Sequence, residues 1–280
     1  MSRSVAILGP GLIGGSLAMA MHRGPSPWEV SLWTRREASV SAVSAVLPRC
    51  RVSNDLKTAV EGAEIVVLCT SPHAIAGSGR SLAEIIPAST PVTDAGSVKT
   101  RIVAALEVSL GGRFIGAHPM AGSEQSGISA ARPDLFDGAV CIITPTPQSN
   151  PQALDRVRGF WREAGCRLAE MSPAAHDKAV ARISHLPHAV AAALVQAAIS
   201  KNPEFGALAG TGYRDTTRIA TGPEAMWGEI FLDNREELLA AIADLQTHIG
   251  ELKNALSRGE REAVESFLRA AGTLRAREIG

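Results

Sequence analysis

A run of six residues near the N-terminus, Gly9-Pro10-Gly11-Leu12-Ile13-Gly14, restricts the fold of this chain more than any other feature. It follows an apolar, strand-like segment at 4–8 and opens a helical pattern that runs to residue 22. A glycine turn in this context binds the pyrophosphate of a dinucleotide, because the N–H groups at a helix start bind anions. We therefore predict cofactor contacts from Gly9, Gly11, Leu12, Ile13 and Gly14; the alternative is a glycine turn without a ligand.

The chain up to Met171 alternates short Val- and Ile-rich runs with helical periodicities, which is typical of βαβ units and a parallel sheet. The predicted strands are 4–8, 29–33, 65–69, 91–94, 113–116, 140–144 and 167–171. The predicted helices between them are 14–22, 36–45, 55–61, 74–86, 98–110 and 151–164.

Strand-like runs stop beyond Met171, and Ala- and Leu-rich segments such as 174–199 and 235–256 predict an all-helical half. Ser172 is suited to cap the first of these helices, with Pro173 in its first turn. The predicted fold class is α/β: a Rossmann-like, doubly wound domain at 1–172, then an all-helical domain at 173–280.

Charge and composition exclude several kinds of partner. The 28 Lys and Arg residues balance the 28 Asp and Glu residues, and only one Tyr is present, so a nucleic-acid partner is not expected. The four cysteines have neither disulfide-framework nor zinc spacing. No run is long and apolar enough to predict a membrane span, and we expect a cytoplasmic protein.

The end of the second predicted strand indicates which dinucleotide is bound. An acidic residue at this position would bind the adenosine ribose hydroxyls, but the chain has Thr34-Arg35-Arg36 there. A hydroxyl and two guanidinium groups suit a 2′-phosphate, which favours NADP over NAD. In the alternative interpretation the two arginines begin a solvated helix and Glu37 reaches the ribose.

Polar residues follow several other predicted strands, at the sheet edge where a doubly wound fold binds its ligands. Thr70 and Ser71 follow the third strand, Ser97 follows the fourth, and His118 follows the fifth. An imidazole at this edge would lie beside the nicotinamide and could exchange a proton near neutral pH. His118 is therefore the first candidate for a catalytic group.

Two clusters in the helical half leave alternatives open. Ser184, His185 and His188 surround a proline, and Arg214 and Arg218 lie in one short stretch. Histidines are often core residues with satisfied hydrogen bonds, and an arginine cluster is often a surface ion-pair group. His185 and His188 could ligate a metal, but no third ligand is evident, so no metal is predicted.

Several motifs, in this order and spacing, resemble the prephenate/arogenate dehydrogenase family of tyrosine biosynthesis. They are the glycine turn continued through Gly15-Ser16-Leu17, Thr93-Asp94-Ala95-Gly96-Ser97-Val98-Lys99, His118-Pro119-Met120-Ala121-Gly122-Ser123-Glu124, His176-Asp177, Ser184-His185-Leu186-Pro187-His188 and Thr217-Arg218-Ile219-Ala220. A generic NADP-binding protein would share only the first of these.

The resemblance implies an oxidative decarboxylation of a cyclohexadienyl substrate. Hydride leaves C4 for the nicotinamide, the C4 hydroxyl loses its proton, and the ring carboxylate leaves as CO2. The resemblance makes His118 the hydrogen-bond acceptor or base at the C4 hydroxyl. It also implies that Ser97 would hold this same hydroxyl. Arg218 would bind a substrate carboxylate through its planar two-donor fork.

Other residues are assigned by the resemblance alone. Ser184, His185 and His188 would line the substrate side. The same side would hold Glu124, Asp215 and Trp227, with Glu124 and Asp215 helping to gate it. Family members are usually homodimers, so a homodimer is expected.

The choice between prephenate and arogenate stays open, with Gln125 as one candidate neighbour of the side chain that differs. One alternative function is a β-hydroxyacid or imine dehydrogenase, which typically relies on a lysine in its helical half. Lys178, Lys201 and Lys253 lack that family's surrounding motif. The other alternative is a non-catalytic NADP-binding sensor, which would not need His118, Ser97 and Arg218 together.

Overall fold

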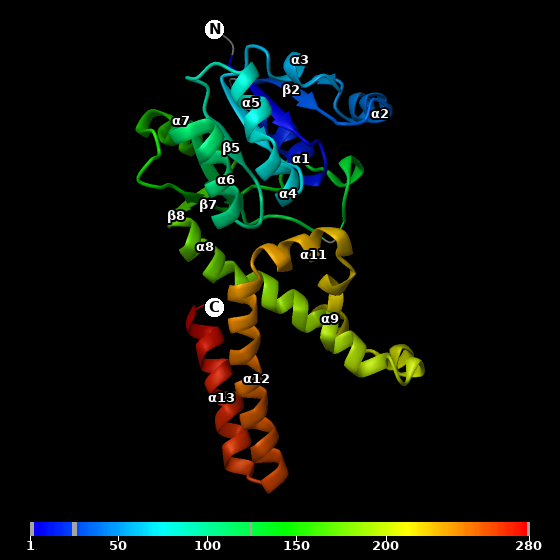
Figure 1. Ribbon diagram of the computed structural model, residues 1–280. Coiled ribbons are helices and arrows are strands. Elements are labelled where there is room, and N and C mark those ends of the chain that lie inside the picture. Colours follow the sequence, from blue (N-terminus) through cyan, green and yellow to red (C-terminus); the bar gives the residue numbers. More distant parts are fainter. Residues whose placement is uncertain (1–2, 24–26, 124, 279–280) are drawn as a thin grey trace. The chain divides into compact units, whose positions relative to one another are not determined.

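The computed structural model describes residues 3–23, 27–123 and 125–278 and contains one eight-stranded sheet with helices on both faces (Figure 1). The strands are β1 (Ser4–Leu8), β2 (Glu29–Trp33), β3 (Arg51–Ser53), β4 (Ile65–Leu68), β5 (Val92–Asp94), β6 (Phe114–Pro119), β7 (Val140–Thr144) and β8 (Arg167–Glu170). The helices among them are α1 (Leu12–Met21), α2 (Ala38–Val46), α3 (Leu56–Val60), α4 (Pro72–Gly77), α5 (Gly79–Ile85), α6 (Thr100–Leu110) and α7 (Pro151–Glu163).

The strand order β3-β2-β1-β4-β5-β6-β7-β8 has its topological switch point between β1 and β4. Strands β1 to β6 are parallel, with Val5 beside Val30 of β2 and Ile65 of β4. In a doubly wound fold, ligands bind outside the carboxyl ends of the strands at such a point. The predicted Rossmann-like fold class is therefore confirmed, and the glycine turn lies at this edge.

The prediction of a parallel sheet is wrong for the last two strands. β7 pairs with β6 in antiparallel register, with His118 beside Ile142, and β8 is parallel to β7. A parallel neighbour needs a crossover, usually an α-helix. The link from β6 to β7 contains only a short 3-10 helix at Ile128–Ala130 in its described part, and the chain returns in the opposite direction.

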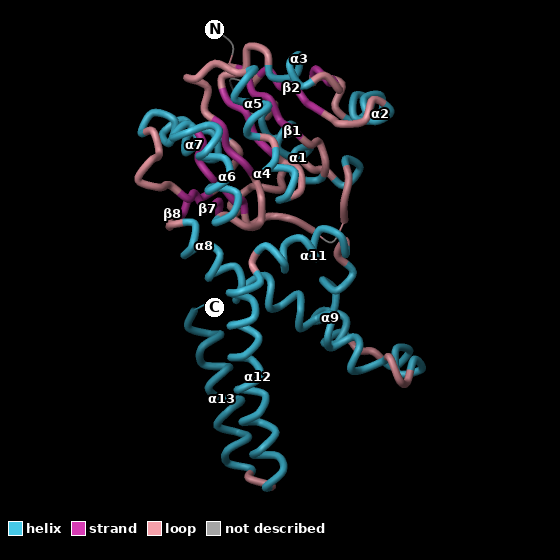
Figure 2. Tube along the Cα trace, in the orientation of Figure 1, coloured by secondary structure: helices cyan, strands magenta, loops and turns pink. Residues whose placement is uncertain are grey.

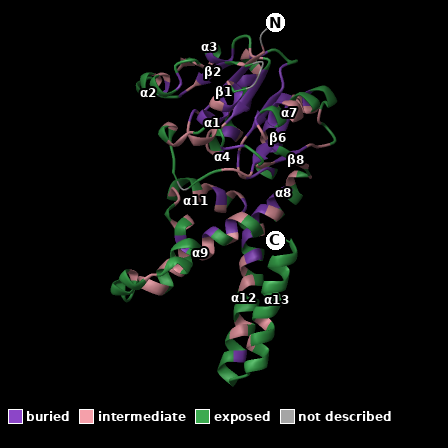
Figure 3. Ribbon diagram, turned by 180° about the vertical axis from the view of Figure 1, so that it is seen from behind, coloured by how far each residue is buried: buried purple, intermediate pink, exposed green. Residues whose placement is uncertain are grey.

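Both faces of the sheet are buried, which explains the continuous apolar runs in the strands. In β1, Val5 and Ile7 pack with α1, α2 and α7, whereas Ala6 and Leu8 pack with α4, α5 and α6 on the other face. Figure 3 shows the buried strands beneath helices with exposed outer surfaces.

Four more helices belong to the same compact unit, which extends to Asn234. They are α8 (Pro173–Val180), α9 (Leu186–Ile199), α10 (Thr211–Thr217) and α11 (Glu224–Asp233). As predicted, Ser172 caps α8, since its hydroxyl accepts the Ala175 N–H at 3.2 Å, and Pro173 is in the first turn. Ile230 of α11 is buried in the core cluster that contains α4 to α6.

The helical segment predicted at 174–199 is interrupted by a π-helical turn, Ala181–His185, between α8 and α9. Figure 2 shows α8 and α9 themselves as helices. The N–H of Leu186 donates to the Ala181 carbonyl, five residues earlier. Pro187 has no N–H to donate to the preceding turn, so a regular helix cannot continue through it. π turns occur frequently at functional sites, and this one carries Ser184 and His185.

Residues 235–280 form the second compact unit. It contains α12 (Arg235–Arg258) and α13 (Arg261–Glu278), which contact each other and are joined by a turn at Gly259 with φ of +67°. In the described part of the chain, no helix is both long enough and apolar enough to cross a membrane.

Candidate functional site

The glycine turn has the backbone geometry that a dinucleotide requires. Gly9 has φ of +99°, a conformation that L side chains rarely adopt, and its N–H donates to the Trp33 carbonyl at 3.0 Å. A Cβ on Gly14 would overlap the Gly9 carbonyl oxygen, so α1 packs directly on the turn. A Cβ on Gly11 would meet nothing within 4 Å, which leaves that backbone open to a phosphate group. The turn therefore fits a nicotinamide dinucleotide.

The other predicted cofactor residues surround this turn or follow β2. Leu12 and Ile13 begin α1 and are half-buried. Thr70 and Ser71 follow β4. The Thr70 methyl group is so close to Gly9 that a Cβ added to Gly9 would lie 2.8 Å from it.

At the end of β2, Thr34 is buried and its N–H donates to the Ser53 carbonyl at 3.0 Å. Arg35 and Arg36 are exposed just before α2, and Glu37 occupies the N-cap position of that helix. Two exposed guanidinium groups therefore follow β2.

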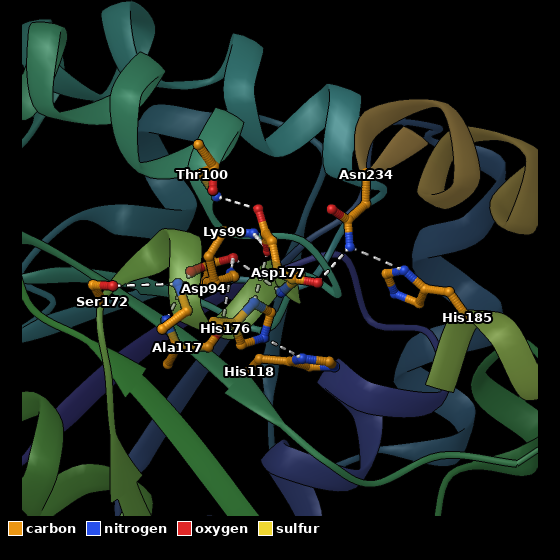
Figure 4. A network of polar contacts seen from close by, with 12 residues as sticks. Asp94, Lys99, Thr100, Ala117, His118, Ser172, His176, Asp177, His185 and Asn234 are labelled. Carbon is orange, nitrogen blue, oxygen red and sulfur yellow. Dashed lines mark hydrogen bonds and ion pairs between the residues drawn. The ribbon is translucent and has the colours of Figure 1, made fainter. Parts of the chain in front are cut away.

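A buried chain of hydrogen bonds connects His118 to a carboxylate (Figure 4). His118 Nδ1 lies 2.8 Å from His176 Nε2, and His176 Nδ1 lies 2.7 Å from Asp177 Oδ1. Asp177 Oδ1 accepts the Lys99 N–H at 2.7 Å and Oδ2 accepts the Thr100 N–H at 2.8 Å, so this carboxylate caps α6. One network of hydrogen bonds thus joins the end of β6, the middle of α8 and the start of α6.

A second buried network fixes the backbone beside His118. The Lys99 ammonium forms an ion pair with Asp94 and donates to the Ala117 carbonyl at 2.9 Å, and neither charged side chain is exposed. Asp94 accepts the Gly96 N–H at 2.9 Å and the Ala117 N–H at 3.0 Å. A buried pair of this kind is tolerated only when further hydrogen bonds satisfy both ions. The buried Asp94–Lys99 pair therefore holds the carboxyl ends of β5 and β6 together.

The predicted substrate-side residues of α9 and α11 are in contact with each other. The rings of His188 and Trp227 stack with centroids 3.6 Å apart. The ring of His185, on the π turn, is nearly perpendicular to that of Trp227, with 6.3 Å between the centroids. The Asn234 amide donates to the Asp177 carbonyl at 2.8 Å and lies 3.2 Å from His185 Nδ1. His185 Nε2 and His188 Nδ1 are buried with no partner among the described residues, and unpaired buried polar groups of this kind call for an explanation such as a bound ligand.

Burial keeps these imidazoles neutral near pH 7. It lowers the pKa of His118 well below the ordinary value, and His176, Lys99 and His185 lower it further. Burial also lowers the pKa of His176, more than the hydrogen bond to Asp177 raises it, and brings the pKa of His185 to about 4. Burial alone would raise the pKa of Asp177, but hydrogen bonds from His176, Thr100 and Lys99 bring it below its ordinary value.

Other predicted residues lie outside these networks. Ser97, between β5 and α6, and Ser184, on the π turn, are half-buried. Arg218 is exposed in a short turn, Arg218–Thr221, that packs against α9, and Asp215 is exposed on α10. Glu124 lies outside the described residues; Gln125 is exposed, and its N–H donates to the Ser123 hydroxyl at 3.1 Å.

Five residues of the networks, Asp94 among them, were not assigned a role from the sequence. Lys99, His176 and Asp177 belong to the motifs that carry the resemblance, and His176-Asp177 after a helix cap was a usable signal. Asn234 had no such signal, because a single amide before a long helix is common. Among the described residues, no group of three or more His, Cys, Asp or Glu residues could hold a metal ion.

Comparisons with known proteins give one consistent result. The family model "Prephenate dehydrogenase, nucleotide-binding domain" matches residues 33–170, and "Prephenate dehydrogenase, dimerization domain" matches residues 172–270. The chain is 30% identical to the prephenate dehydrogenase of Bacillus subtilis over 97% of this chain and 75% of the relative.

Two solved structures cover nearly all of the chain. The Aquifex aeolicus prephenate dehydrogenase, in complex with hydroxyphenyl propionate and NAD+, matches with a TM-score of 0.92 and 31% identity over 99% of this chain and 98% of that chain. The Synechocystis arogenate dehydrogenase matches with a TM-score of 0.83 and 30% identity over 98% and 99%. The similarity therefore extends through both the sheet and the helical segments.

Proposed function

The chain belongs to the prephenate dehydrogenase family, and from this premise we propose that it oxidatively decarboxylates prephenate or arogenate in tyrosine biosynthesis, with NADP preferred over NAD. The observation that carries the proposal is the buried, neutral His118 at the same sheet edge as a glycine turn suited to a dinucleotide. The bound nicotinamide supplies the hydride acceptor for this chemistry.

His118 is the proposed base at the C4 hydroxyl of the substrate. A neutral imidazole can accept that proton while the hydroxyl carbon becomes a carbonyl, and its low pKa keeps it in the accepting form at neutral pH. Departure of the ring carboxylate as CO2 then makes the ring aromatic. Ser97 is proposed to hold the same hydroxyl, since it follows β5 next to the fixed Asp94–Lys99 pair.

The remaining site residues keep their proposed roles on the substrate side. Arg218 binds a substrate carboxylate, because its guanidinium group presents two parallel donors. Ser184, His185, His188 and Trp227 line the same side, supported by the stacked rings and the unpartnered ring nitrogens of the two histidines. Asp215 and Glu124 are proposed to gate it.

The preference for NADP rests on Thr34, Arg35 and Arg36, which follow β2 where a 2′-phosphate would lie. The A. aeolicus relative was solved with NAD+, so the preference is a property to measure for this chain. In Arg35→Ala/Arg36→Ala, loss of charge-assisted hydrogen bonds should lower kcat/KM for NADP by roughly 10- to 100-fold and leave that for NAD within about threefold. Arg80→Ala, at an exposed arginine of α5, is the control.

The first experiment measures reduced-cofactor formation with prephenate and arogenate, each with NAD and with NADP. Turnover of either substrate, fastest with NADP, supports the proposal and identifies the substrate. If no combination turns over while NADP still binds, the dehydrogenase proposal is lost, and a non-catalytic NADP-binding protein or a hydroxyacid dehydrogenase takes its place.

We also propose that the chain is a homodimer, with residues 1–172 binding the dinucleotide and residues 173–280 contributing to the substrate side and to dimerisation. The match of residues 172–270 to a dimerization-domain model supports the proposed role of residues 173–280 in dimerisation. The cytoplasmic location stays a prediction from the sequence.

A further inference from the structure

We propose that His176 and Asp177 are positioning residues that fix the tautomer of His118, so that His118 Nε2 always presents a lone pair to the substrate hydroxyl. The inference rests on the proposed function for its kinetic consequence, but the tautomer itself is a property of the protein alone. It is carried by the buried chain Asp177–His176–His118 (Figure 4).

The chain begins at an anchored carboxylate. Both oxygens of Asp177 accept backbone N–H groups, from Lys99 and Thr100, at the start of the eleven-residue helix α6. The helix dipole and these two donors stabilise the ionised form. Asp177 is therefore a pure acceptor with a fixed orientation.

A pure acceptor determines the proton position on the next ring. His176 Nδ1 lies 2.7 Å from Asp177 Oδ1, so Nδ1 must carry a hydrogen to donate. His176 is fully buried and neutral, and a neutral imidazole has only one N–H group. Its Nε2 is consequently an acceptor.

The same reasoning fixes His118. His118 Nδ1 lies 2.8 Å from His176 Nε2, with the two rings at an interplanar angle of 65°. If the proton of His118 were on Nε2, two lone pairs would face each other at this distance. The proton is therefore on Nδ1, and Nε2 remains free to accept.

The arrangement also prepares the site for the proton that His118 receives. When Nε2 takes the hydroxyl proton, the imidazolium donates more strongly through Nδ1 to His176, and the charge of Asp177 stabilises the cation through that ring. Among the described residues, the other charged or titratable groups near His118 are Lys99, whose positive charge opposes that of the imidazolium, His185, which is itself neutral near pH 7, and Asp94, which is neutralised by Lys99. Asp177 thus supplies the one unneutralised carboxylate of the network.

Nitrogen-15 NMR of the full chain labelled at histidine tests the tautomer directly, because long-range proton couplings distinguish a protonated ring nitrogen from a bare one. The chain has seven histidines, and the signal that disappears in His118→Asn identifies His118. We expect Nδ1–H in the unmodified protein at pH 7. Finding Nε2–H, or an even mixture, overturns the proposal.

Two substitutions of His176 separate positioning from packing. His176→Gln keeps a side-chain acceptor for His118 Nδ1–H and should retain the Nδ1–H form, whereas His176→Leu removes the acceptor and should give a mixture. An unchanged Nδ1–H form in a folded His176→Leu protein contradicts the proposal.

Kinetics test the consequence for catalysis. In Asp177→Asn we expect kcat to fall roughly tenfold or more, with KM changed by less than about threefold. Loss of the negative charge should also move the acid limb of kcat to lower pH. A purely structural cap would lower the melting temperature without moving that limb, which would contradict the proposal.

Asp155→Asn, at an exposed ion pair on α7, is the matched control and should leave rate and profile unchanged. An unmodified protein that turns over no substrate would refute the proposed function, while the NMR measurement would still decide the tautomer.

Discussion

At the residue scale, the strongest prediction concerns His118, whose ring is the only proposed proton acceptor at the substrate hydroxyl. In His118→Asn the side chain keeps hydrogen-bonding groups but cannot take up a proton. We expect kcat to fall by about 10² to 10⁴, with the dissociation constant for NADP unchanged within about threefold. Initial rates and a fluorescence titration measure the two quantities.

His248→Asn, at an exposed histidine on α12, is the matched control for this substitution and should turn over normally. If His118→Asn keeps its activity, proton transfer to this ring is refuted and the sensor interpretation gains support.

A second residue-scale prediction follows from the lowered histidine pKa values. His185 has a pKa of about 4 in the folded chain, against about 6.5 when unfolded. Below pH 6.5 the unfolded state binds more protons than the folded state, so the free energy of unfolding decreases as pH falls. This shift alone corresponds to roughly 3 kcal/mol lost between pH 7 and pH 4, and His118 and His176 add to it in the same direction.

Urea unfolding at several pH values between 7 and 4.5 checks this dependence. His185→Gln, which cannot gain a proton there, should show a shallower decrease. A free energy of unfolding that stays level from pH 7 to pH 5 would show that the three histidines are not held neutral by burial.

The sequence pointed to His118 as the candidate reactive residue, but not to the side chains that the structure places around it. His118 could be proposed because it comes at the end of a buried strand, on the ligand edge of a doubly wound fold, although β6 runs to Pro119 and includes His118 instead of ending at residue 116 as predicted. The Asp94–Lys99 pair and the Asp177–His176 chain were not, since their members come from β5, α6 and α8. Only the packing of these elements brings them within hydrogen-bond distance.

At the element scale, the β1–α1 turn allows a paired test of two glycines. In Gly14→Ala the new Cβ overlaps the Gly9 carbonyl oxygen, so α1 must shift, and overpacking of this kind costs about 1–3 kcal/mol. In Gly11→Ala the Cβ meets nothing within 4 Å, and the only expected loss is the poorer N-cap preference of Ala, about 0.5 kcal/mol. We therefore expect Gly14→Ala to lower the melting temperature clearly and Gly11→Ala to leave it nearly unchanged.

Cofactor titration completes the comparison. Gly11→Ala should weaken NADP binding although the protein stays stable, because its methyl group occupies the space where phosphate approaches. Equal effects of the two substitutions on stability, or unaltered NADP binding in Gly11→Ala, would contradict the assigned geometry.

Element positions were more predictable than element directions. Strands β1, β2 and β7 agree with the predicted ranges because each is a short apolar run between turn residues. The three-residue strand β3 was missed, since Arg51-Val52-Ser53 carries little apolar signal. The antiparallel direction of β7 depends on the long link that precedes it, and hydrophobic periodicity does not report direction.

At the scale of the whole molecule, the unit formed by α12 and α13 leaves much apolar surface uncovered. Ile249 and Leu256, seven residues apart on one face of α12, are 55% and 62% exposed, and Leu268 of α13 is 59% exposed. Apolar residues at this spacing on one face of a helix can form the seam of a helix–helix interface. A second copy of the chain is the expected partner, because the family model matched by residues 172–270 is a dimerization domain.

The last prediction is that this seam holds the dimer together. Light scattering after size-exclusion chromatography should give twice the 29.3 kDa mass of the chain. Ile249→Glu/Leu256→Glu places two charges in the seam, which is costly once water is excluded, and should give the mass of one chain. Val108→Glu, at an 88% exposed apolar residue of α6, is the control and should remain a dimer. If the Ile249→Glu/Leu256→Glu protein stays dimeric, the interface lies elsewhere on the chain, because the seam could not bury the two introduced glutamates of each copy.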